Sequence, residues 1–234
     1  MITETNMNTW NGFYKKICDT CGTGSFGKHF LFRGQRDAGW KLETSFDRSQ
    51  VGTLVERERA FDKALEALRN RLEFGGIQPP NGDELAGLAQ HYGMPTRILD
   101  WSYSPYVSMF FACAGALEAG SRPALYILDV EAMRKNVSSK SELSIVDYQP
   151  AKNERLRSQR GCFTFLKGDF SSIDDFLVSK NLGVPIITKV KVGRAVIKPA
   201  LEQLFSMDIT YERLFPGLEG SAKQAWLEHI LENS

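Results

Sequence analysis

A chain of 234 residues can form one large domain or two small ones and can bury a substantial core. Its composition, 42% hydrophobic and 24% charged, is ordinary for a soluble globular protein, and no apolar run approaches the roughly 20 residues of a membrane span. With 29 basic and 28 acidic residues the formal charge is +1, which gives no electrostatic case for a nucleic-acid or membrane partner, although a local basic patch is compatible with it.

The four cysteines indicate reduced thiols, and with no signal-peptide pattern at the N-terminus we expect a cytoplasmic protein. Cys18 and Cys21 form a C-x-x-C, which is compatible with zinc or redox chemistry. No second pair and no two histidines at ligand spacing complete a four-ligand site, so we expect no metal. Cys113 lies in an apolar stretch and Cys162 beside a strand, where free cysteines act as small hydrophobic residues.

The first quarter of the chain predicts one helix and one strand. Residues 1–7 look like a loose tail, and apolar residues from Trp10 to Ile17 recur at helical spacing. The apolar run 30–32 predicts a buried strand that presents Arg33 at its end. Gly34 then allows the backbone to pass close to another segment. Core contacts are expected from three residues of the following loop, Trp40, Leu42 and Phe46.

Three helices are predicted in the middle of the chain. Residues 54–74 form a long amphipathic pattern that Gly75 ends. Asp83 can cap a short helix after it. Ser104, which is followed by proline, is a good N-cap for a helix to about Glu118. That last helix is apolar nearly all round, so we expect it to be central.

The second half of the chain alternates strands and short helices. Residues 137–153 are polar and aperiodic and predict a long surface loop, a candidate lid. Strands are expected at 124–130, 162–166 and 186–192, and helices at 131–136, 194–207, 211–214 and 220–231. With no internal repeat and no linker, the chain is predicted to be one α+β domain with a sheet flanked by helices.

The segment 91–104 carries the densest group of polar residues. Gly93 and Pro95 stiffen a turn-rich stretch, and rigid loops with polar side chains are frequent functional sites. Another interpretation is structural: Arg97 pairs with Asp100, and Trp101 fills the core. The candidate binding residues of this segment are His91, Tyr92, Thr96, Arg97, Asp100, Trp101 and Ser104.

Three further residues could carry chemistry. An arginine on a buried strand beside a glycine, as at Arg33, offers a planar fork for phosphate or carboxylate oxygens, and Gln35 lies next to it. If Ser104 caps the following helix, Ser102 is available for another task. Gln159 is placed to point into a cleft formed with Arg33. A structural ion pair for Arg33 and an edge-strand surface position for Gln159 are the structural interpretations.

Four segments form a recognisable set: Phe32-Arg33-Gly34-Gln35, then His91 through Asp100-Trp101, then Gln159-Arg160-Gly161-Cys162-Phe163, and finally Leu214 through Gly220. Together they resemble the FRG domain, a bacterial and phage-associated family named for its Phe-Arg-Gly motif. The resemblance spans about residues 28–220. It implies an N-terminal helix and loop at 1–27, the FRG domain at 28–220, and a C-terminal helix of the same domain at 221–234.

A more distant resemblance is to the ADP-ribosyltransferase fold of the Arg-Ser-Glu kind. Arg33-Gly34 is similar to the arginine-glycine of its first strand, and Ser102-Tyr103-Ser104 is similar to its Ser-x-Ser segment before a helix. This resemblance implies a central mixed or antiparallel sheet and NAD as the substrate. Arg33, Gly34 and Gln35 would then hold phosphates or ribose, Ser102 would support the nicotinamide ribose, and Tyr92 or Trp101 would stack on nicotinamide.

The chain departs from that family at Gln159, where a glutamate stabilises an oxocarbenium-like charge. Either Glu154 or Asp100 substitutes, or the fold persists without transfer. Three hypotheses follow. The protein is an ADP-ribosyltransferase-like toxin or phage-defence effector; it is a non-catalytic module that binds a nucleotide, nucleic acid or peptide; or it is a hydrolase that uses Ser102, His91 and Asp100.

Overall fold

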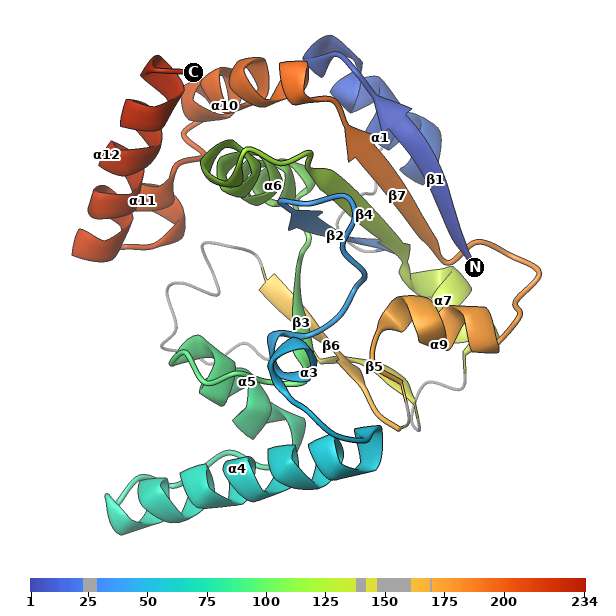
Figure 1. Cartoon of the computed structure of the whole chain (residues 1–234), viewed down its shortest axis with the longest axis vertical. Helices are drawn as coiled ribbons and strands as arrows, with labels where there is room; N and C mark the ends of the chain where they lie inside the picture. The colour runs from blue at the N-terminus through green and yellow to red at the C-terminus, as the bar shows by residue number, and fades with distance from the viewer. Residues whose placement is uncertain (23–28, 138–141, 147–160, 169) are drawn as a thin grey trace.

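In a computed structural model, which describes residues 1–22, 29–137, 142–146, 161–168 and 170–234, the seven described strands form one sheet. Its order is β1-β7-β4-β2-β3-β6-β5 (Figure 1). β1 and β7 are parallel, and every other neighbouring pair is antiparallel. The predicted fold class, α+β with one sheet flanked by helices, is confirmed. The strands are β1 (Ile2–Met7), β2 (Phe30–Gln35), β3 (Ile98–Ser102), β4 (Ala124–Asp129), β5 (Leu143–Val146), β6 (Gly161–Leu166) and β7 (Ile187–Val192).

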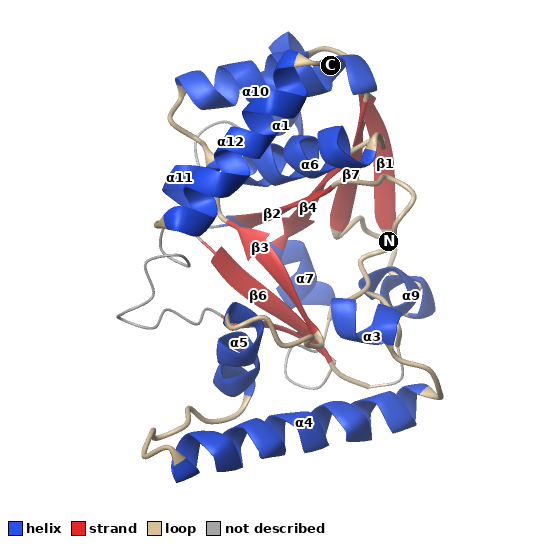
Figure 2. Ribbon diagram, turned by 60° about the vertical axis from the view of Figure 1, so that its left-hand side comes forward, coloured by secondary structure: helices blue, strands red, loops and turns tan. Residues whose placement is uncertain are grey.

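Helices cover both faces of the sheet, as Figure 2 shows. Within the described residues, the two 3-10 turns are η1 (Trp10–Gly12) and η2 (Arg194–Val196). The α-helices are α1 (Phe13–Cys21), α3 (Ser45–Ser49), α4 (Leu54–Phe74), α5 (Asp83–His91), α6 (Pro105–Ala119), α7 (Val130–Asn136), α9 (Ile173–Ser179), α10 (Ile197–Ser206), α11 (Tyr211–Leu214) and α12 (Leu218–Glu232). None of them is both long enough and apolar enough to cross a bilayer.

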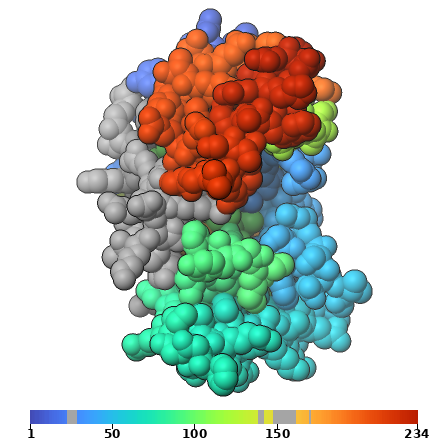
Figure 3. Space-filling model, turned by 90° about the vertical axis from the view of Figure 1, so that its left-hand side faces the viewer, coloured from blue at the N-terminus to red at the C-terminus, as the bar shows by residue number. Residues whose placement is uncertain are grey.

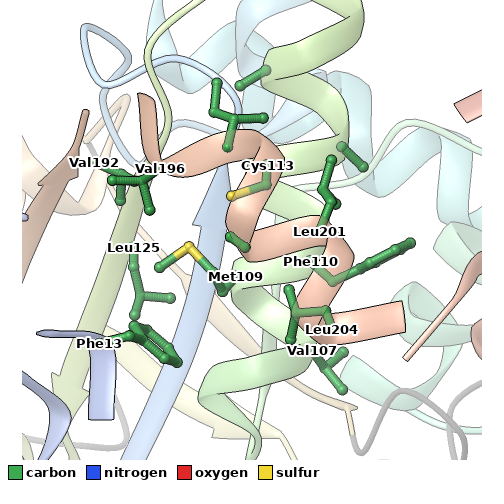
Figure 4. Packing of buried hydrophobic residues seen from close by; sticks show 14 of the residues in the cluster. Phe13, Val107, Met109, Phe110, Cys113, Leu125, Val192, Val196, Leu201 and Leu204 are labelled. Carbon is green, nitrogen blue, oxygen red and sulfur yellow. The ribbon is translucent and has the colours of Figure 1, made fainter. Parts of the chain in front are cut away.

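Helix α6 is the centre of the larger core, as its apolar pattern predicts. Ser104 caps it, because its Oγ accepts a hydrogen bond from the amide of Val107 at 3.3 Å, and Pro105 occupies the first turn. Its side chains pack against β4, β7, α1 and α10 (Figure 4). Phe110 and Cys113 are completely buried there, so Cys113 behaves as the predicted small hydrophobic residue.

The opposite face of the sheet has a second core, which α7 and α9 cover. A third, smaller cluster joins α3, α4 and α5 to β3 and β6 through Phe61, Ile98 and Phe163. Helix α4 has the predicted bounds and a Thr53–Glu56 capping box, but Phe61 is its one buried residue. The helix therefore lies along the edge of the molecule, with most of its surface in solvent (Figures 1 and 2).

The N-terminal segment corrects a prediction. Residues 1–7 are not a loose tail, because Ile2–Met7 forms strand β1 on the edge of the sheet, paired with β7. The hydroxyls of Thr3 and Thr188 lie 3.2 Å apart, and Glu4 contacts the ammonium of Lys191 at 2.5 Å. The sequence signal was weak, because an edge strand with mixed burial does not show a clean apolar alternation.

Two further strands were not predicted. Ile98–Ser102, interpreted as part of a turn-rich segment, is strand β3, and Leu143–Val146 within the predicted loop is strand β5. The remainder of the predicted lid, 138–141 and 147–153, lies outside the described residues. Two smaller predictions were also wrong: Gly82, not Asp83, is the N-cap of α5, and Trp40 is 36% exposed rather than a core residue.

Candidate functional site

The sheet is nearly divided between β2 and β3. These strands are paired at one position, Phe32 with Ser102, while β2 pairs with β4 along its whole length. A cavity of about 340 Å³ lies at this division, between the sheet, α6 and the end of α5. Figure 3 shows a hollow on this side of the molecule, between the red C-terminal helices and the green α5.

Arg33 lies one residue beyond the Phe32–Ser102 pair, inside β2 rather than at its predicted end. Its Nη1 donates a hydrogen bond to the backbone carbonyl of Asp100 at 2.7 Å, which replaces a ladder bond that the diverging strands do not form. Among the residues that the structure describes, its buried Nε has no hydrogen-bond partner. Burial lowers the pKa of the guanidinium, and the nearby Asp100 carboxylate raises it. A half-buried cation with an unused buried donor favours an anionic or polar ligand.

Gly34 holds β2 against α6. A Cβ at this position would lie 1.9 Å from the carbonyl oxygen of Ser108 and 2.8 Å from the amide nitrogen of Ala112. Both contacts are with helix backbone, so no rotamer change could relieve them. The glycine thus permits the close approach expected from the sequence, and this approach positions Arg33 at the cavity.

Asp100 supplies the negative charge of the site. It is exposed, and its Oδ1 accepts a hydrogen bond from Nε2 of Gln90 at 2.5 Å. The Oε1 of Gln90 in turn accepts a hydrogen bond from the Thr96 hydroxyl, which is completely buried. The end of α5 therefore fixes this carboxylate, the one acidic side chain among the residues that line the cavity.

Ser102 is buried beside the helix that it precedes. Its Oγ accepts a hydrogen bond from the amide of Ser104 at 3.0 Å, while Ser104 caps α6. As predicted, Ser104 caps the helix. It does not line the cavity, whereas Ser102 does.

Aromatic rings provide much of the remaining wall. Trp101 is 2% exposed, and its Nε1 donates to the hydroxyl of Thr164 at 2.8 Å, which agrees with the alternative, structural interpretation of this segment. The rings of Phe111 and Phe215 meet edge to face with centroids 5.9 Å apart. An aromatic wall beside a guanidinium suits a ligand with both a planar ring and an anionic group. The described residues that line the cavity are Phe32, Arg33, Gly34, Gln90, His91, Asp100, Trp101, Ser102, Ser108, Phe111, Gly161, Cys162, Phe163 and Phe215.

Comparison with known families identifies the part of the chain that builds most of this cavity. A family model described as the FRG domain matches residues 28–120, from the start of β2 to the end of α6. Residues 28–120 are an FRG domain. No curated protein and no solved structure matches the chain. The ADP-ribosyltransferase resemblance therefore rests on the quoted motifs alone.

The FRG match contains Arg33, Asp100 and Ser102, but it does not contain the whole cavity. Gly161, Cys162 and Phe163 of β6, and Phe215 after α11, complete the wall from outside the matched region. The domain limits of 1–27, 28–220 and 221–234 stay predictions. The sequence after residue 120 contributes side chains to the same site.

The FRG domain brings six of the predicted site residues together around the cavity. They are Arg33, Gly34, His91, Asp100, Trp101 and Ser102. Four other binding candidates besides Ser104 do not line it: Gln35, Tyr92, Thr96 and Arg97. Gln159, and with it Glu154, lies outside the described residues. The catalytic and binding roles assigned to all these residues stay predictions.

Three of the candidates that do not line the cavity have clear local roles. Gln35 is 5% exposed and donates through Nε2 to the carbonyl of Lys41 at 3.2 Å, which fixes the loop after β2. Tyr92 is 79% exposed, and its ring meets that of His91 edge to face, so it projects into solvent. Thr96 supports Gln90 from within the core.

Arg97 corrects the structural hypothesis for this segment. It pairs not with Asp100 but with Asp47, with Nε 3.2 Å from Oδ1, and both side chains are almost fully buried. Its Nη2 donates to the carbonyl of Phe170 at 3.4 Å. Arg97 lies just before β3 and lines not the cavity but a separate hollow of about 400 Å³ between α4 and α5.

Sequence reasoning missed several residues that line the cavity. Gln90 precedes the polar segment by one residue and falls within a predicted helix. Ser108 and Phe111 lie on α6, whose uniformly apolar pattern gives no indication of which face meets a cavity. Phe163 and Phe215 were part of the quoted FRG motifs, which is the one signal that could have identified them.

Metal-ligand geometry is not found in the described part of the chain, where no three His, Cys, Asp or Glu side chains are grouped to share an ion. Cys18 and Cys21 are free and half-buried on the last turns of α1. Burial raises the pKa of the Cys21 thiol to about 12, so it is protonated near neutral pH.

Proposed function

We propose that the cavity between β2 and β3 binds NAD and that the protein is an ADP-ribosyltransferase-like enzyme. The observation that carries the proposal is Arg33, a half-buried guanidinium whose buried Nε has no partner among the described residues, in a cavity that also contains a carboxylate and several aromatic rings. A dinucleotide has matching groups, since it combines phosphates, ribose hydroxyls and planar bases.

Each side chain has a role that its position supports. Arg33 binds phosphate or ribose oxygens through its free donor. Ser102, the last residue of β3, supports the nicotinamide ribose. Phe111 or Phe215 supplies a ring for nicotinamide, a task for which Trp101 is too deeply buried and Tyr92 too far into solvent.

Asp100 takes the place of the missing glutamate in this proposal. In ADP-ribosyl transfer the bond between C1′ of the ribose and the nicotinamide nitrogen breaks, and nicotinamide leaves with the bonding electron pair. A nucleophilic acceptor then forms a bond to C1′ and loses its proton. The positive charge that develops on the ribose is stabilised by a fixed carboxylate, and Asp100 is the acidic side chain among the described residues of the cavity lining.

A non-catalytic binding module is the second candidate function. It is favoured by Gln159, which is neutral where the transferase family has an acid. The Asp100 carboxylate also accepts a hydrogen bond from Gln90, which weakens its ability to stabilise a cation. The same cavity would then hold its ligand without turnover.

Incubation of the pure protein with NAD tests both candidates. Nicotinamide release, followed by chromatography, and a rise of the melting temperature with NAD support the enzyme. A thermal shift without release identifies a binding module. Asp100→Asn should abolish release while the thermal shift is retained, because the carboxylate acts on the developing charge and not on the phosphates. The absence of both release and shift in the parent protein contradicts an NAD site.

The hydrolase hypothesis has a separate test. Ser102, His91 and Asp100 all line the cavity, but the Oγ of Ser102 accepts a hydrogen bond from the amide of Ser104. A serine-reactive fluorophosphonate should therefore leave Ser102 unlabelled, as measured by mass spectrometry of the intact protein. Labelling at Ser102 would revive nucleophilic catalysis.

A further inference from the structure

Two arginines, Arg36 of the loop between β2 and α3 and Arg48 of α3 itself, pack on the exposed Trp40 of that loop. The guanidinium carbon of Arg36 lies 4.8 Å from the centroid of the Trp40 ring, and that of Arg48 lies 5.4 Å from it. Trp40 is 36% exposed. The hydroxyl of Tyr126 donates to the Trp40 carbonyl at 2.8 Å, so the sheet fixes the position of the loop.

The positive charge of this cluster is not neutralised by a carboxylate. Among the described residues neither Arg36 nor Arg48 forms an ion pair with an acid, and Arg48 donates instead to the carbonyl of Glu43 at 2.6 Å. Lys41 in the same loop does have a partner, since it lies 2.7 Å from Asp175. Two like charges over one ring repel each other, so a bound anion would stabilise them.

The cluster lies near the cavity, although none of its three residues lines it. Arg48 lies close enough to Arg33 for its charge to lower the pKa of the Arg33 guanidinium. Arg36 lies against α6, since its Cβ would be 3.1 Å from a Cβ placed at Gly115. The blue segment that contains this loop borders the hollow in Figure 3.

We propose that Arg36, Trp40 and Arg48 form a binding site for single-stranded nucleic acid. Guanidinium groups bind phosphate oxygens in a bidentate manner, and bases stack on an exposed indole or on a guanidinium plane. A strand with both phosphates and bases uses the charge and the ring together, whereas an acidic peptide uses the charge alone. The formal charge of +1 for the chain permits such a local patch. This site does not depend on NAD binding.

Fluorescence anisotropy with a labelled 12-nucleotide oligothymidylate and no NAD tests the site. Trp40→Ala should raise the dissociation constant about 5- to 150-fold, the range for loss of one base–aromatic stack. The double variant Arg36→Ala/Arg48→Ala should weaken binding at least about tenfold. It should also reduce the slope of log affinity against log salt by about 1.4, since each phosphate contact contributes roughly 0.7 on a single strand.

Matched controls separate this site from general charge and general aromatic exposure. Trp226 on α12 is 57% exposed, and Trp226→Ala should bind like the parent. Arg59 and Arg71 on α4 are exposed, and Arg59→Ala/Arg71→Ala removes the same charge without changing affinity. Trp40→Phe retains a ring and should stay within about twofold of the parent, which distinguishes lost stacking from a damaged fold.

Three results would overturn the proposal. The first is parental affinity in Trp40→Ala or in the double arginine variant. The second is an equal loss of affinity in the control variants. The third is competition by polyglutamate of equal charge that matches competition by unlabelled oligonucleotide, which would instead identify an acidic protein segment as the ligand. Failure of the NAD assay leaves this result unaffected, because the anisotropy experiment contains no NAD.

Discussion

Two arginines, Arg33 on β2 and Arg97 just before β3, have opposite relations to their surroundings. Arg97 is buried with Asp47 at 3.2 Å and also donates to the carbonyl of Phe170, so the fold itself neutralises its charge. Arg33 makes one hydrogen bond to the carbonyl of Asp100, and its buried Nε has no partner. The first arginine holds elements together, and the second is available for a ligand.

This difference shows why an arginine in a motif is not by itself a site. The hydrogen-bond donors of a buried guanidinium need acceptors, and a fold that supplies all of them leaves nothing for a ligand. Arg97 obtains a carboxylate from α3, about fifty residues earlier in the chain. Arg33 lies where β2 and β3 diverge, and there it lines a cavity.

Removal of the Arg97 charge should have the largest effect on the free energy of unfolding. Arg97→Met leaves the Asp47 carboxylate buried without a cationic partner. We therefore expect a loss of about 3–5 kcal/mol in the free energy of unfolding, measured by urea denaturation. Arg97→Met/Asp47→Leu removes both charges and should recover much of that loss. If the single variant were as stable as the parent, the comparison between the two arginines would fail.

Gly34→Ala should have the next largest effect, because a Cβ would lie 1.9 Å from the Ser108 carbonyl oxygen. Strand β2 must then move away from α6, and we expect a loss of at least about 1–3 kcal/mol in unfolding free energy. Gly183→Ala is the matched control, since a Cβ there meets no atom within 4 Å and its φ is not positive. Equal stability of the two variants would show that the close approach is unimportant.

Arg33→Lys tests whether Arg33, in contrast to Arg97, is available for a ligand. Lysine retains the charge but not the planar fork, so NAD affinity should fall about 10- to 100-fold, which corresponds to loss of a charge-assisted hydrogen bond of roughly 1.5–3 kcal/mol. The unfolding free energy should change by no more than about 1 kcal/mol. The readouts are the NAD-dependent thermal shift and urea denaturation. A large stability loss with unchanged NAD affinity would assign Arg33 the structural role of Arg97.

The smallest effect concerns Tyr211, whose ring packs on Phe215 at the cavity wall with centroids 5.8 Å apart. Burial raises the pKa of this phenol from its ordinary value of about 10 to about 12. Below pH 10 the folded and unfolded chains both keep the proton. Between pH 10 and 12 the unfolded chain releases it first, so stability falls as the pH rises.

Between pH 9 and 11 the melting temperature of Tyr211→Phe should therefore fall less than that of the parent, by about 3–5 °C. Burial also raises the pKa of Tyr126. Because Tyr126 is present in both proteins, its contribution to the pH dependence cancels in the comparison. Identical pH profiles for parent and variant would contradict a raised pKa for Tyr211.

Local sequence signals identified the helices whose caps and apolar repeats lie within a few residues of one another. The bounds of α4, with its Thr53 capping box, agree with the amphipathic repeat, and α6 begins at the predicted Ser104–Pro105 cap. These features depend on residues three or four positions apart, which is the distance over which helix capping and amphipathicity act. Strands β1, β3 and β5 were missed, because their stability depends on partners far along the chain.

The sequence by itself determined the fold class, the central helix and the FRG motifs that carry Arg33, Gly34 and Asp100. Only the tertiary structure decided that Arg33 and Ser102 line one cavity, that Arg97 forms an ion pair with Asp47, and that Arg36 and Arg48 both pack on Trp40. The physical reason is that the partner of a charged side chain is set by which strands and helices pack together, and that packing joins residues that no local pattern connects.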